Sequence, residues 1–327
     1  MSAQDRTLDR YQELMQINAA SHVLRAAREA GLFNELRKGQ RTLGQLTEAL
    51  SLAPETTELL LDCLVSMSVI ERYGDDNALS PVMRLLCEHD TDLGDASWLS
   101  LVDKLNQRTT VADDSAYLDG IAATQWIHTP AAVQAAEILD LSGSELDVEP
   151  NAVPPLRILD LGCGSAVWSC AMAYSDSTAT VVAVDNQAAL EAAERAAQAI
   201  DLGTRFTFVI GDPEDAKLDS GDFDLVVIAQ RLHSSTSEAA KRMLEQAKKS
   251  LISGGRLIII DLFRGPTKPR LSETIEALRL HLSTECGRIR SIKDTEAQLE
   301  GAGLIDIQFT FLAASRINLG MMVARKP

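Results

Sequence analysis

Residues 158–166 read Ile158-Leu159-Asp160-Leu161-Gly162-Cys163-Gly164-Ser165-Ala166, an apolar run that ends in a glycine-rich turn. A stretch of helical character follows this turn. Glycines in such a place let the backbone approach a ligand closely, in the crevice beyond the carboxyl end of a strand. We therefore expect residues 156–161 to form a strand and the turn after it to bind a ligand.

The residues around the turn indicate what kind of ligand binds. Asp185 closes the next apolar run, about 20 residues on, where a carboxylate can accept both hydroxyls of a ribose. Asp160 precedes the first glycine by two positions, where a carboxylate would repel a pyrophosphate but could receive an ammonium group. Val167 is branched, whereas a dinucleotide fingerprint needs a small residue there. A cationic amino-acid nucleoside therefore fits better than a dinucleotide.

Apolar runs alternate with helical stretches along the rest of the chain. This alternation predicts an α/β fold, a doubly wound and mostly parallel Rossmann-like sheet of seven strands. The last two strands follow one another without a helix and could form a closing hairpin. The predicted strands cover residues 156–161, 180–184, 206–210, 225–228, 256–260, 305–311 and 321–324.

The first hundred residues have a different pattern, which is mainly helical. Apolar side chains of residues 14–27 share one helix face, and Gly31 can end that helix in the left-handed conformation. Residues 42–46 and 54–66 predict two more helices, and residues 69–80 predict a hairpin. Helices followed by such a hairpin indicate an N-terminal winged-helix domain that is all helical apart from this wing.

The region between these two parts is less regular. Residues 100–140 predict further helices, the last with Thr129 as its cap and Pro130 at its first position. Residues 140–155 are polar, contain three prolines and lack a helical stripe, so we expect a linker there. The predicted domains are a winged-helix domain at 1–100, a helical connection with the linker at 101–150, and the α/β domain at 151–327.

Composition excludes several classes of protein. The chain has 327 residues, 46% of them hydrophobic, and no run approaches the roughly 18 uncharged apolar residues of a membrane helix. Its first ten residues are charged where a signal peptide would be apolar. Five cysteines show no metal-binding spacing, which is typical of reduced thiols. We therefore expect a cytoplasmic protein that binds neither membrane nor metal.

The net charge of −16 is unevenly distributed along the chain. Residues 1–150 carry 25 acidic and 11 basic side chains, whereas residues 151–327 carry 22 and 20. The candidate recognition helix of the winged domain, residues 54–66, has three acids and no Lys or Arg. Affinity for DNA depends on cationic contacts to phosphate, so these numbers disfavour nucleic acid as a partner and a DNA-binding regulator as the function.

The turn resembles the (Asp/Glu)-x-Gly-x-Gly-x-Gly motif of class I S-adenosylmethionine-dependent methyltransferases, with Ala166 replacing the third glycine. Further elements of that family follow in order: residues 211–212 after the third strand, residues 223–227 in the fourth, and residues 253–258 leading into the fifth. The resemblance implies S-adenosylmethionine as the cofactor and S-adenosylhomocysteine as its product. The cofactor-binding residues it implies are Asp160, Gly162, Gly164, Asp185, Asn186, Gly211, Asp212 and Gln230.

Both halves together resemble the small-molecule O-methyltransferases related to plant caffeate and acetylserotonin enzymes. The N-terminal blocks at residues 30–33, 41–46, 59–71 and 79–81 carry this resemblance. It implies O-methylation of a hydroxylated aromatic or related small molecule, and a homodimer formed through the N-terminal domain. The resemblance is weakest over residues 90–155, where that family builds part of its substrate pocket, so the acceptor stays open.

His233 matches the position of the family's general base, just after the fourth strand. An imidazole that titrates near pH 6.5 is a suitable acceptor for a phenol proton. Ser234 and Ser235 replace the family's Asp-Trp pair, so His233 could instead be a loop residue before a serine-capped helix. Asp261 matches the acid that orients the histidine, whereas Ile289 stands where the family has a second acid.

Two aromatic residues in the connecting region are candidates for the substrate pocket. Trp126 and His128 could line an aromatic site, or they could pack at a domain junction and cap a helix. The altered context of His233 also leaves N- or C-methylation open. The resemblance implies hydroxylation or decarboxylation with bound cofactor as further alternatives, because relatives of that family carry out these reactions. The mass of the product would separate these reactions.

Overall fold

The computed structural model describes residues 3–81, 83–84, 95–108, 113–141, 155–218, 221–265 and 268–327. Its backbone contacts divide the chain into two compact units, Met1–Leu99 and Ser100–Pro327. The helices of residues 101–141 fall in the same unit as the large sheet. The predicted linker covers residues 140–155, and its residues 142–154 lie outside the described residues.

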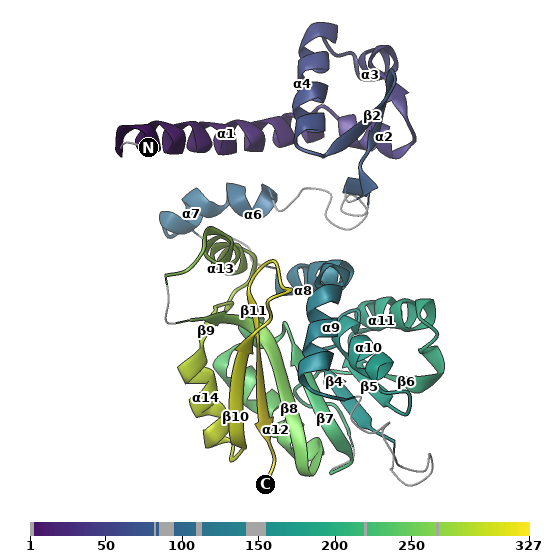
Figure 1. The fold of residues 1–327 in the computed structure, drawn as a ribbon, viewed down its shortest axis with the longest axis vertical. Helices are drawn as coiled ribbons and strands as arrows, with labels where there is room; N and C mark the ends of the chain where they lie inside the picture. The colour runs from purple at the N-terminus through teal and green to yellow at the C-terminus, as the bar shows by residue number, and fades with distance from the viewer. Residues whose placement is uncertain are drawn as a thin grey trace. The chain divides into compact units, whose positions relative to one another are not determined.

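The N-terminal unit is a set of helices around a small antiparallel sheet (Figure 1). The sheet has the order β1-β3-β2, so the expected hairpin is present and a short third strand, which the sequence did not reveal, pairs with it. The elements are α1 (Ala3–Glu29), α2 (Leu32–Arg37), β1 (Arg41–Thr42), α3 (Leu43–Leu50), α4 (Pro54–Ser66), β2 (Ile70–Tyr73), β3 (Asp76–Leu79) and α6 (Asp95–Leu99).

Local sequence signals set the helix boundaries in this unit. Gly31 adopts φ 79°, the left-handed conformation, in the turn between α1 and α2. Thr42 and Gln45 form a reciprocal capping box at the start of α3, which satisfies two backbone N–H groups. Helix α4 runs from Pro54 to Ser66, as the sequence predicts.

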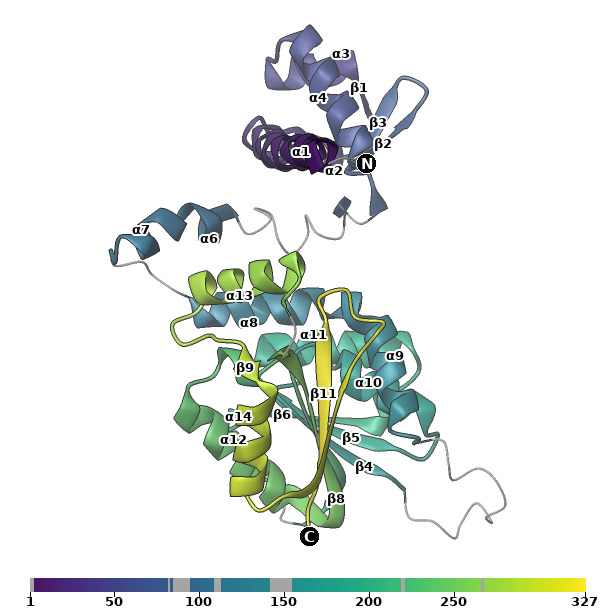
Figure 2. The same cartoon turned by 60° about the vertical axis from the view of Figure 1, so that its left-hand side comes forward.

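A mostly parallel sheet in the order β10-β11-β8-β7-β4-β5-β6 forms the centre of the C-terminal unit, and the two-residue β9 pairs with β8 (Figures 1 and 2). Strands β4 to β8 run parallel, while β11 is antiparallel to both β8 and β10. This confirms the doubly wound Rossmann-like sheet with an antiparallel end. The strands are β4 (Arg157–Leu161), β5 (Thr180–Asp185), β6 (Phe206–Ile210), β7 (Phe223–Ala229), β8 (Leu251–Arg264), β9 (Arg290–Ser291), β10 (Ile305–Phe311) and β11 (Leu319–Arg325).

Helices cover both faces of this sheet (Figure 2). Successive residues of β4 point to opposite faces, so Ile158 packs in one core cluster with α9, α10 and α11, and Leu159 packs in the other with α12 and α14. Both faces are therefore buried, which explains the continuous apolar runs. The helices are α7 (Leu101–Leu105), α8 (Asp114–Thr124), α9 (Thr129–Ile138), α10 (Val167–Ser175), α11 (Gln187–Ala199), α12 (Ser237–Ser250), α13 (Leu271–Ser283) and α14 (Ile292–Gly301), with 3-10 turns at Gln125–His128, Gly203–Arg205 and Leu232–Ser234.

The start of α9 differs by one residue from the predicted cap. His128 occupies the cap position, and Thr129 is already the first helical residue. The Thr129 hydroxyl donates to the carbonyl oxygen of Trp126 at 2.7 Å instead of accepting from the helix. A 3-10 turn leads directly into the helix here, so its first N–H groups do not need a capping side chain.

Candidate functional site

The glycine-rich turn after β4 is held in a conformation that glycine favours. Gly162 and Gly164 have φ of 74° and 56°, and Ala166 also lies in the left-handed region. The Gly162 N–H donates to the carbonyl oxygen of Val184 at 2.9 Å, and the Gly164 N–H donates to a carboxylate oxygen of Asp185 at 2.9 Å. The end of β5 therefore fixes the turn that follows β4.

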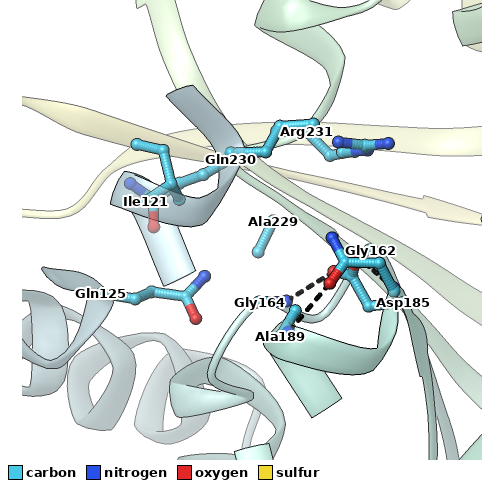
Figure 3. Close-up of a pocket in the computed structure, with 11 residues that line it drawn as sticks. Ile121, Gln125, Gly162, Gly164, Asp185, Ala189, Ala229, Gln230 and Arg231 are labelled. Atoms are coloured by element: carbon cyan, nitrogen blue, oxygen red, sulfur yellow. Dashed lines mark hydrogen bonds between the residues drawn. The ribbon is translucent and has the colours of Figure 1, made fainter. Parts of the chain in front are cut away.

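A small pocket that is partly open to solvent lies at the carboxyl ends of β4, β5 and β7 (Figure 3). Helix α8 and the turn after it supply its other wall. The pocket brings together five residues of the expected cofactor set, from three separate segments of the chain. Its lining residues are Leu118, Ile121, Gln125, Gly162, Gly164, Asp185, Asn186, Ala189, Ala229, Gln230 and Arg231.

Two buried donor atoms of the pocket lining, Nε2 of Gln125 and Nε of Arg231, have no hydrogen-bond partner among the described residues. The Oε1 atom of Gln125 accepts from the Ser165 N–H and hydroxyl at 3.0 and 3.1 Å, so its amide group has a defined orientation. The Arg231 side chain crosses Gly162, where a Cβ atom would lie 3.0 Å from its Cγ. Unsatisfied buried donors are costly, so their presence here indicates a polar ligand.

Asp160 lies behind the turn and does not line the pocket. Its side chain is buried, and the Ser169 hydroxyl donates to its Oδ2 at 2.5 Å. Within the described part of the chain, its Oδ1 has no hydrogen-bond partner. Burial raises the pKa of Asp160 to about 7, since the hydrogen bond from Ser169 only partly offsets the loss of hydration.

The other expected cofactor residues lie around the ends of β5, β6 and β7. Asn186 caps α11 by accepting from the Ala189 N–H at 3.0 Å. The Gly211 N–H donates to the carbonyl oxygen of Asp185 at 3.1 Å, which ties the end of β6 to β5. Asp212 is exposed and accepts from the Glu214 N–H at 3.0 Å, and neither it nor Gly211 belongs to the pocket lining.

His233 and Asp261 form a buried pair next to this pocket. Nδ1 of His233 faces Oδ1 of Asp261, and the His233 backbone N–H donates to Oδ2 of the same carboxylate at 3.0 Å. The Leu262 N–H also donates to Oδ1, at 2.7 Å. Among the described residues, no second carboxylate bonds to His233, and Ile289 packs against the apolar core instead.

The remaining ring nitrogen of His233 contacts a tyrosine. The hydroxyl of Tyr117, on α8, lies 2.9 Å from Nε2 of His233, and the two rings meet edge to face. Burial raises the pKa of the Tyr117 phenol, so it stays protonated at neutral pH. The hydrogen on Tyr117 and the carboxylate on the other side place the imidazole proton on Nδ1 and leave Nε2 as the acceptor.

The two aromatic candidates of the connecting region have different surroundings: His128 is buried, and Trp126 is partly exposed. His128 is buried, stacks on Trp168 with ring centres 6.1 Å apart, and has its Nε2 3.1 Å from the amide nitrogen of Gln230. Burial lowers the pKa of His128 to about 4, so the ring is neutral and accepts this hydrogen bond. Trp126 is 38% exposed and lies outside the pocket lining.

Tyr117, Ile121 and Gln125 are site residues that the sequence reasoning missed. They are four residues apart and therefore share one face of α8 and the turn that follows. This spacing was a usable signal, because a tyrosine and a glutamine interrupt an otherwise apolar or small face.

Two further features of the described residues bear on the class of protein. No helix among them is both long and apolar enough to cross a membrane. Nor do they bring three or more His, Cys, Asp or Glu side chains together in a way that could hold a metal ion.

The fold and the site together define a nucleoside-binding α/β domain with a His–Asp pair beside its pocket, which is the arrangement of a methyltransferase. Family models agree: residues 158–255 match a methyltransferase domain, and residues 12–85 match an O-methyltransferase dimerisation domain. The chain belongs to the S-adenosylmethionine-dependent O-methyltransferase family, and it is an enzyme of that family.

Individual proteins are similar over most of the chain. Demethylspheroidene O-methyltransferase of Cereibacter sphaeroides is 23% identical over 88% of this chain and 79% of its own. Among solved structures, mitomycin 7-O-methyltransferase superposes with a TM-score of 0.72 at 18% identity, covering 99% of both chains. Human N-acetylserotonin methyltransferase in complex with S-adenosylmethionine gives 0.69 at 20% identity, covering 100% of this chain and 98% of that one. These structures share the fold of this chain.

Proposed function

We propose that this enzyme methylates a hydroxyl oxygen of an aromatic or related small molecule, with His233 as the general base. The observation that carries the proposal is the buried pair of His233 and Asp261, whose histidine follows the pocket residues Gln230 and Arg231 by three and two positions. Its relatives support a small acceptor, since two of them are named for demethylspheroidene and N-acetylserotonin.

The pocket residues fit S-adenosylmethionine. Asp185, at the end of β5, lines the pocket and would accept the two ribose hydroxyls. The unpartnered donors of Gln125 and Arg231 suit the carboxylate of the methionine part. Gly162 and Gly164 leave room for close approach, while Asp160 supports the turn from behind. Asn186, Gly211, Asp212 and Gln230 complete the proposed set around the strand ends.

The bound cofactor supplies an electrophilic methyl group on a sulfonium, so the protein has to align the acceptor and manage its proton. Asp261 accepts from Nδ1–H of His233 and holds the ring in the tautomer whose Nε2 is free to accept. The proton of the acceptor hydroxyl then passes to Nε2 of His233. The Asp261 carboxylate stabilises the imidazolium that results.

We further propose a cytoplasmic homodimer that forms through the N-terminal unit. Helix α1 exposes a stripe of large apolar side chains, and the match to a dimerisation domain covers most of this unit. Among the described cysteines, all four are free thiols, which suits a reducing compartment. The exposed stripe consists of Leu8, Tyr11, Leu14, Met15 and Ile17.

Calorimetry with S-adenosylhomocysteine tests the cofactor site. The wild-type protein should bind it, Asp185→Asn should bind at least tenfold more weakly, and Asp201→Asn, an exposed control after α11, should bind as the wild type does. Absence of binding to the wild-type protein would refute the proposed function.

Turnover measurements test whether His233 is the general base. A panel of phenols with S-adenosylmethionine should yield a product heavier by one methyl group, and His233→Gln should lower kcat by about 10²- to 10⁴-fold while it still binds S-adenosylhomocysteine. If His233→Gln turns over at the wild-type rate, His233 is not the base, although the cofactor assignment stands.

A further inference from the structure

The hydroxyl of Tyr117 lies at the place where the acceptor hydroxyl has to be. Proton transfer requires the acceptor oxygen within hydrogen-bond distance of Nε2 of His233, and the Tyr117 oxygen is already 2.9 Å from that atom. Tyr117 and His233 are only 6% and 1% exposed, so no solvent hydroxyl substitutes for this contact. A phenol of the protein thus holds the position that a phenolic acceptor needs.

We propose that Tyr117 is an internal stand-in for the acceptor: its phenol occupies Nε2 of His233 in the free enzyme, gives way to the acceptor hydroxyl, and returns after methylation. This inference rests on the proposed function and adds a specificity residue to it. Tyr117 would touch the same atom as the acceptor, in alternation with it.

Tyr117 and the acceptor alternate because Nε2 of His233 is buried and can accept from only one of the two hydroxyls at a time. An acceptor hydroxyl that displaces Tyr117 exchanges one donor on Nε2 for another, so the exchange is nearly neutral. Directly after methylation Nε2 carries the proton taken from the acceptor hydroxyl, and His233 has to release this proton to water before the next cycle. Once Nε2 is neutral again, a bound methyl ether has no hydrogen to donate to it and would leave it buried without a partner. Tyr117 therefore recaptures His233 once the acceptor is methylated, which disfavours the bound product and rejects analogues that lack the hydroxyl.

Neighbouring residues keep Tyr117 close to His233 when its hydroxyl is displaced. Arg279, on α13, lies over the Tyr117 ring with its guanidinium carbon 5.4 Å from the ring centre. Arg279 is itself fixed by Glu276, one turn earlier on α13, through several N–H to carboxylate bonds. The chain just after α13 is also joined to the start of α8, since the Glu285 N–H donates to Oδ1 of Asp114 at 2.8 Å. The ring thus keeps a second contact that does not depend on its hydroxyl.

The raised pKa of Tyr117 explains why the enzyme does not methylate the hydroxyl of Tyr117 itself. A protonated phenol is a poor nucleophile, and burial keeps Tyr117 protonated. Its hydroxyl can therefore donate to His233 without becoming the group that is methylated. The neighbouring pocket residues Leu118 and Ile121, on the same helix, place Tyr117 at the border between the cofactor pocket and the base.

Substituting Tyr117→Phe removes the hydroxyl and keeps the ring. With S-adenosylhomocysteine present, we expect 4-nitrophenol and its methyl ether 4-nitroanisole each to bind about tenfold more tightly to this variant, because neither has to displace a hydroxyl from Nε2. Tyr174→Phe, at a 72% exposed site on α10, is the matched control and should bind both probes as the wild type does. Unchanged or weaker binding of both probes to Tyr117→Phe overturns the proposal.

Nitrogen NMR of the histidine rings gives a reading that needs no ligand. In the free protein, Tyr117→Phe should shift the Nε2 resonance of His233, assigned with His233→Gln, toward that of a nitrogen without a donor, and Tyr174→Phe should leave it unchanged. An unmoved resonance would show that Tyr117 does not hold Nε2. This measurement is independent of cofactor binding, so its outcome is distinct from a failure of the proposed function.

Steady-state kinetics of Tyr117→Phe distinguish the proposed stand-in from a proton relay, in which Tyr117 would pass the acceptor's proton to His233. With a phenol that is turned over, Tyr117→Phe should lower KM and the inhibition constant of the methylated product by about tenfold, with kcat within a few-fold of the wild type. A relay predicts instead a 10²-fold or greater loss of kcat, and that result would overturn the proposal.

A second measurement serves if Tyr117→Phe fails to fold. Wild-type protein labelled with 3-fluorotyrosine should show a change at the Tyr117 resonance when 4-nitrophenol is added. An unchanged resonance would contradict the proposal.

Discussion

The two oxygens of Asp261 accept three hydrogen bonds, from the backbone N–H groups of His233 and Leu262 and from Nδ1 of His233. Asp261→Asn replaces one of these oxygens by an NH₂ group, which cannot accept. If the amide donates to Nδ1, the imidazole takes the other tautomer and its Nε2 carries a hydrogen. We expect kcat to fall by about 10²-fold or more, because that tautomer cannot take the acceptor's proton.

The measurement is kcat under saturating S-adenosylmethionine, with calorimetry of S-adenosylhomocysteine to show that the cofactor pocket is intact. Asp201→Asn is the matched control, since it makes the same chemical change at an exposed position. A kcat for Asp261→Asn within twofold of the wild type would mean that the carboxylate does not set the tautomer of His233.

The raised pKa of Asp160 predicts how the free energy of unfolding depends on pH. Its pKa is about 7 in the folded protein, where burial dominates, and about 4 in an unfolded chain. Between these values the folded protein holds a proton that the unfolded chain has released, so the free energy of unfolding falls as the pH rises from about 4 to about 7. The loss attributable to Asp160 is on the order of 4 kcal/mol.

Asp160→Asn mimics the protonated acid and should remove this loss, since the asparagine oxygen can still accept from Ser169. Urea unfolding at pH 5 and pH 7 measures the effect: the difference between the two pH values should be smaller in Asp160→Asn than in the wild type. Asp201→Asn should keep the wild-type difference. Parallel curves for Asp160→Asn and the wild type would contradict the buried, protonated state.

At the residue scale, sequence could predict those site residues that follow strand ends. Asp185, Gln230, His233 and Asp261 come directly after apolar runs, and the carboxyl ends of parallel strands meet at one edge of a sheet. Tyr117 could not be paired with His233 in this way, because 116 residues separate them and the contact depends on how α8 packs. Their pairing is a property of the tertiary structure.

At the scale of elements, a substitution at Gly164 tests why the turn after β4 contains glycine. In Gly164→Ala the new Cβ would lie 3.0 Å from Oε1 of Gln125, which bonds to Ser165, and the left-handed backbone would add about 1–2 kcal/mol of strain. We expect S-adenosylhomocysteine to bind at least tenfold more weakly, because both the turn and Gln125 have to shift. Calorimetry measures this change.

Gly254→Ala is the control for backbone strain alone. Gly254 has φ 80°, but a Cβ there would meet nothing within 4 Å, and the residue lies outside the pocket lining. It should lose a similar amount of stability and bind S-adenosylhomocysteine normally. Equal binding by both variants would mean that the close approach of Gln125 to Gly164 has no part in cofactor binding.

Elements were predictable wherever a buried face imposed a regular pattern. Residues 206–210 and 305–311 form β6 and β10 with the predicted bounds, and α4 also matches. Strand β8, Leu251–Arg264, is much longer than the predicted residues 256–260, because it begins directly after α12 and passes through Gly254 and Gly255. Pairing with neighbouring strands outweighs the local preference of glycine there.

At the scale of the whole molecule, the charge distribution and the exposed apolar surface point to one use of the N-terminal unit. Its acidic balance disfavours DNA, and the first half of its longest helix exposes five large apolar side chains between Leu8 and Ile17. Exposed apolar side chains gathered on a helix fit a second copy of the same helix better than they fit water. We therefore propose that the homodimer forms through α1.

Placing a charge in this stripe should separate the dimer. Ile17→Glu changes a 54% exposed side chain, so the protomer loses little stability, while a carboxylate buried in the dimer interface would have no partner. Sedimentation velocity at micromolar concentration should show a dimer for the wild type and a monomer for Ile17→Glu. Tyr174→Glu, which adds the same charge at a 72% exposed apolar position on α10, should stay dimeric. A dimeric Ile17→Glu would exclude α1 as the interface, because one buried, unpaired carboxylate on each protomer is enough to disfavour association by several kcal/mol.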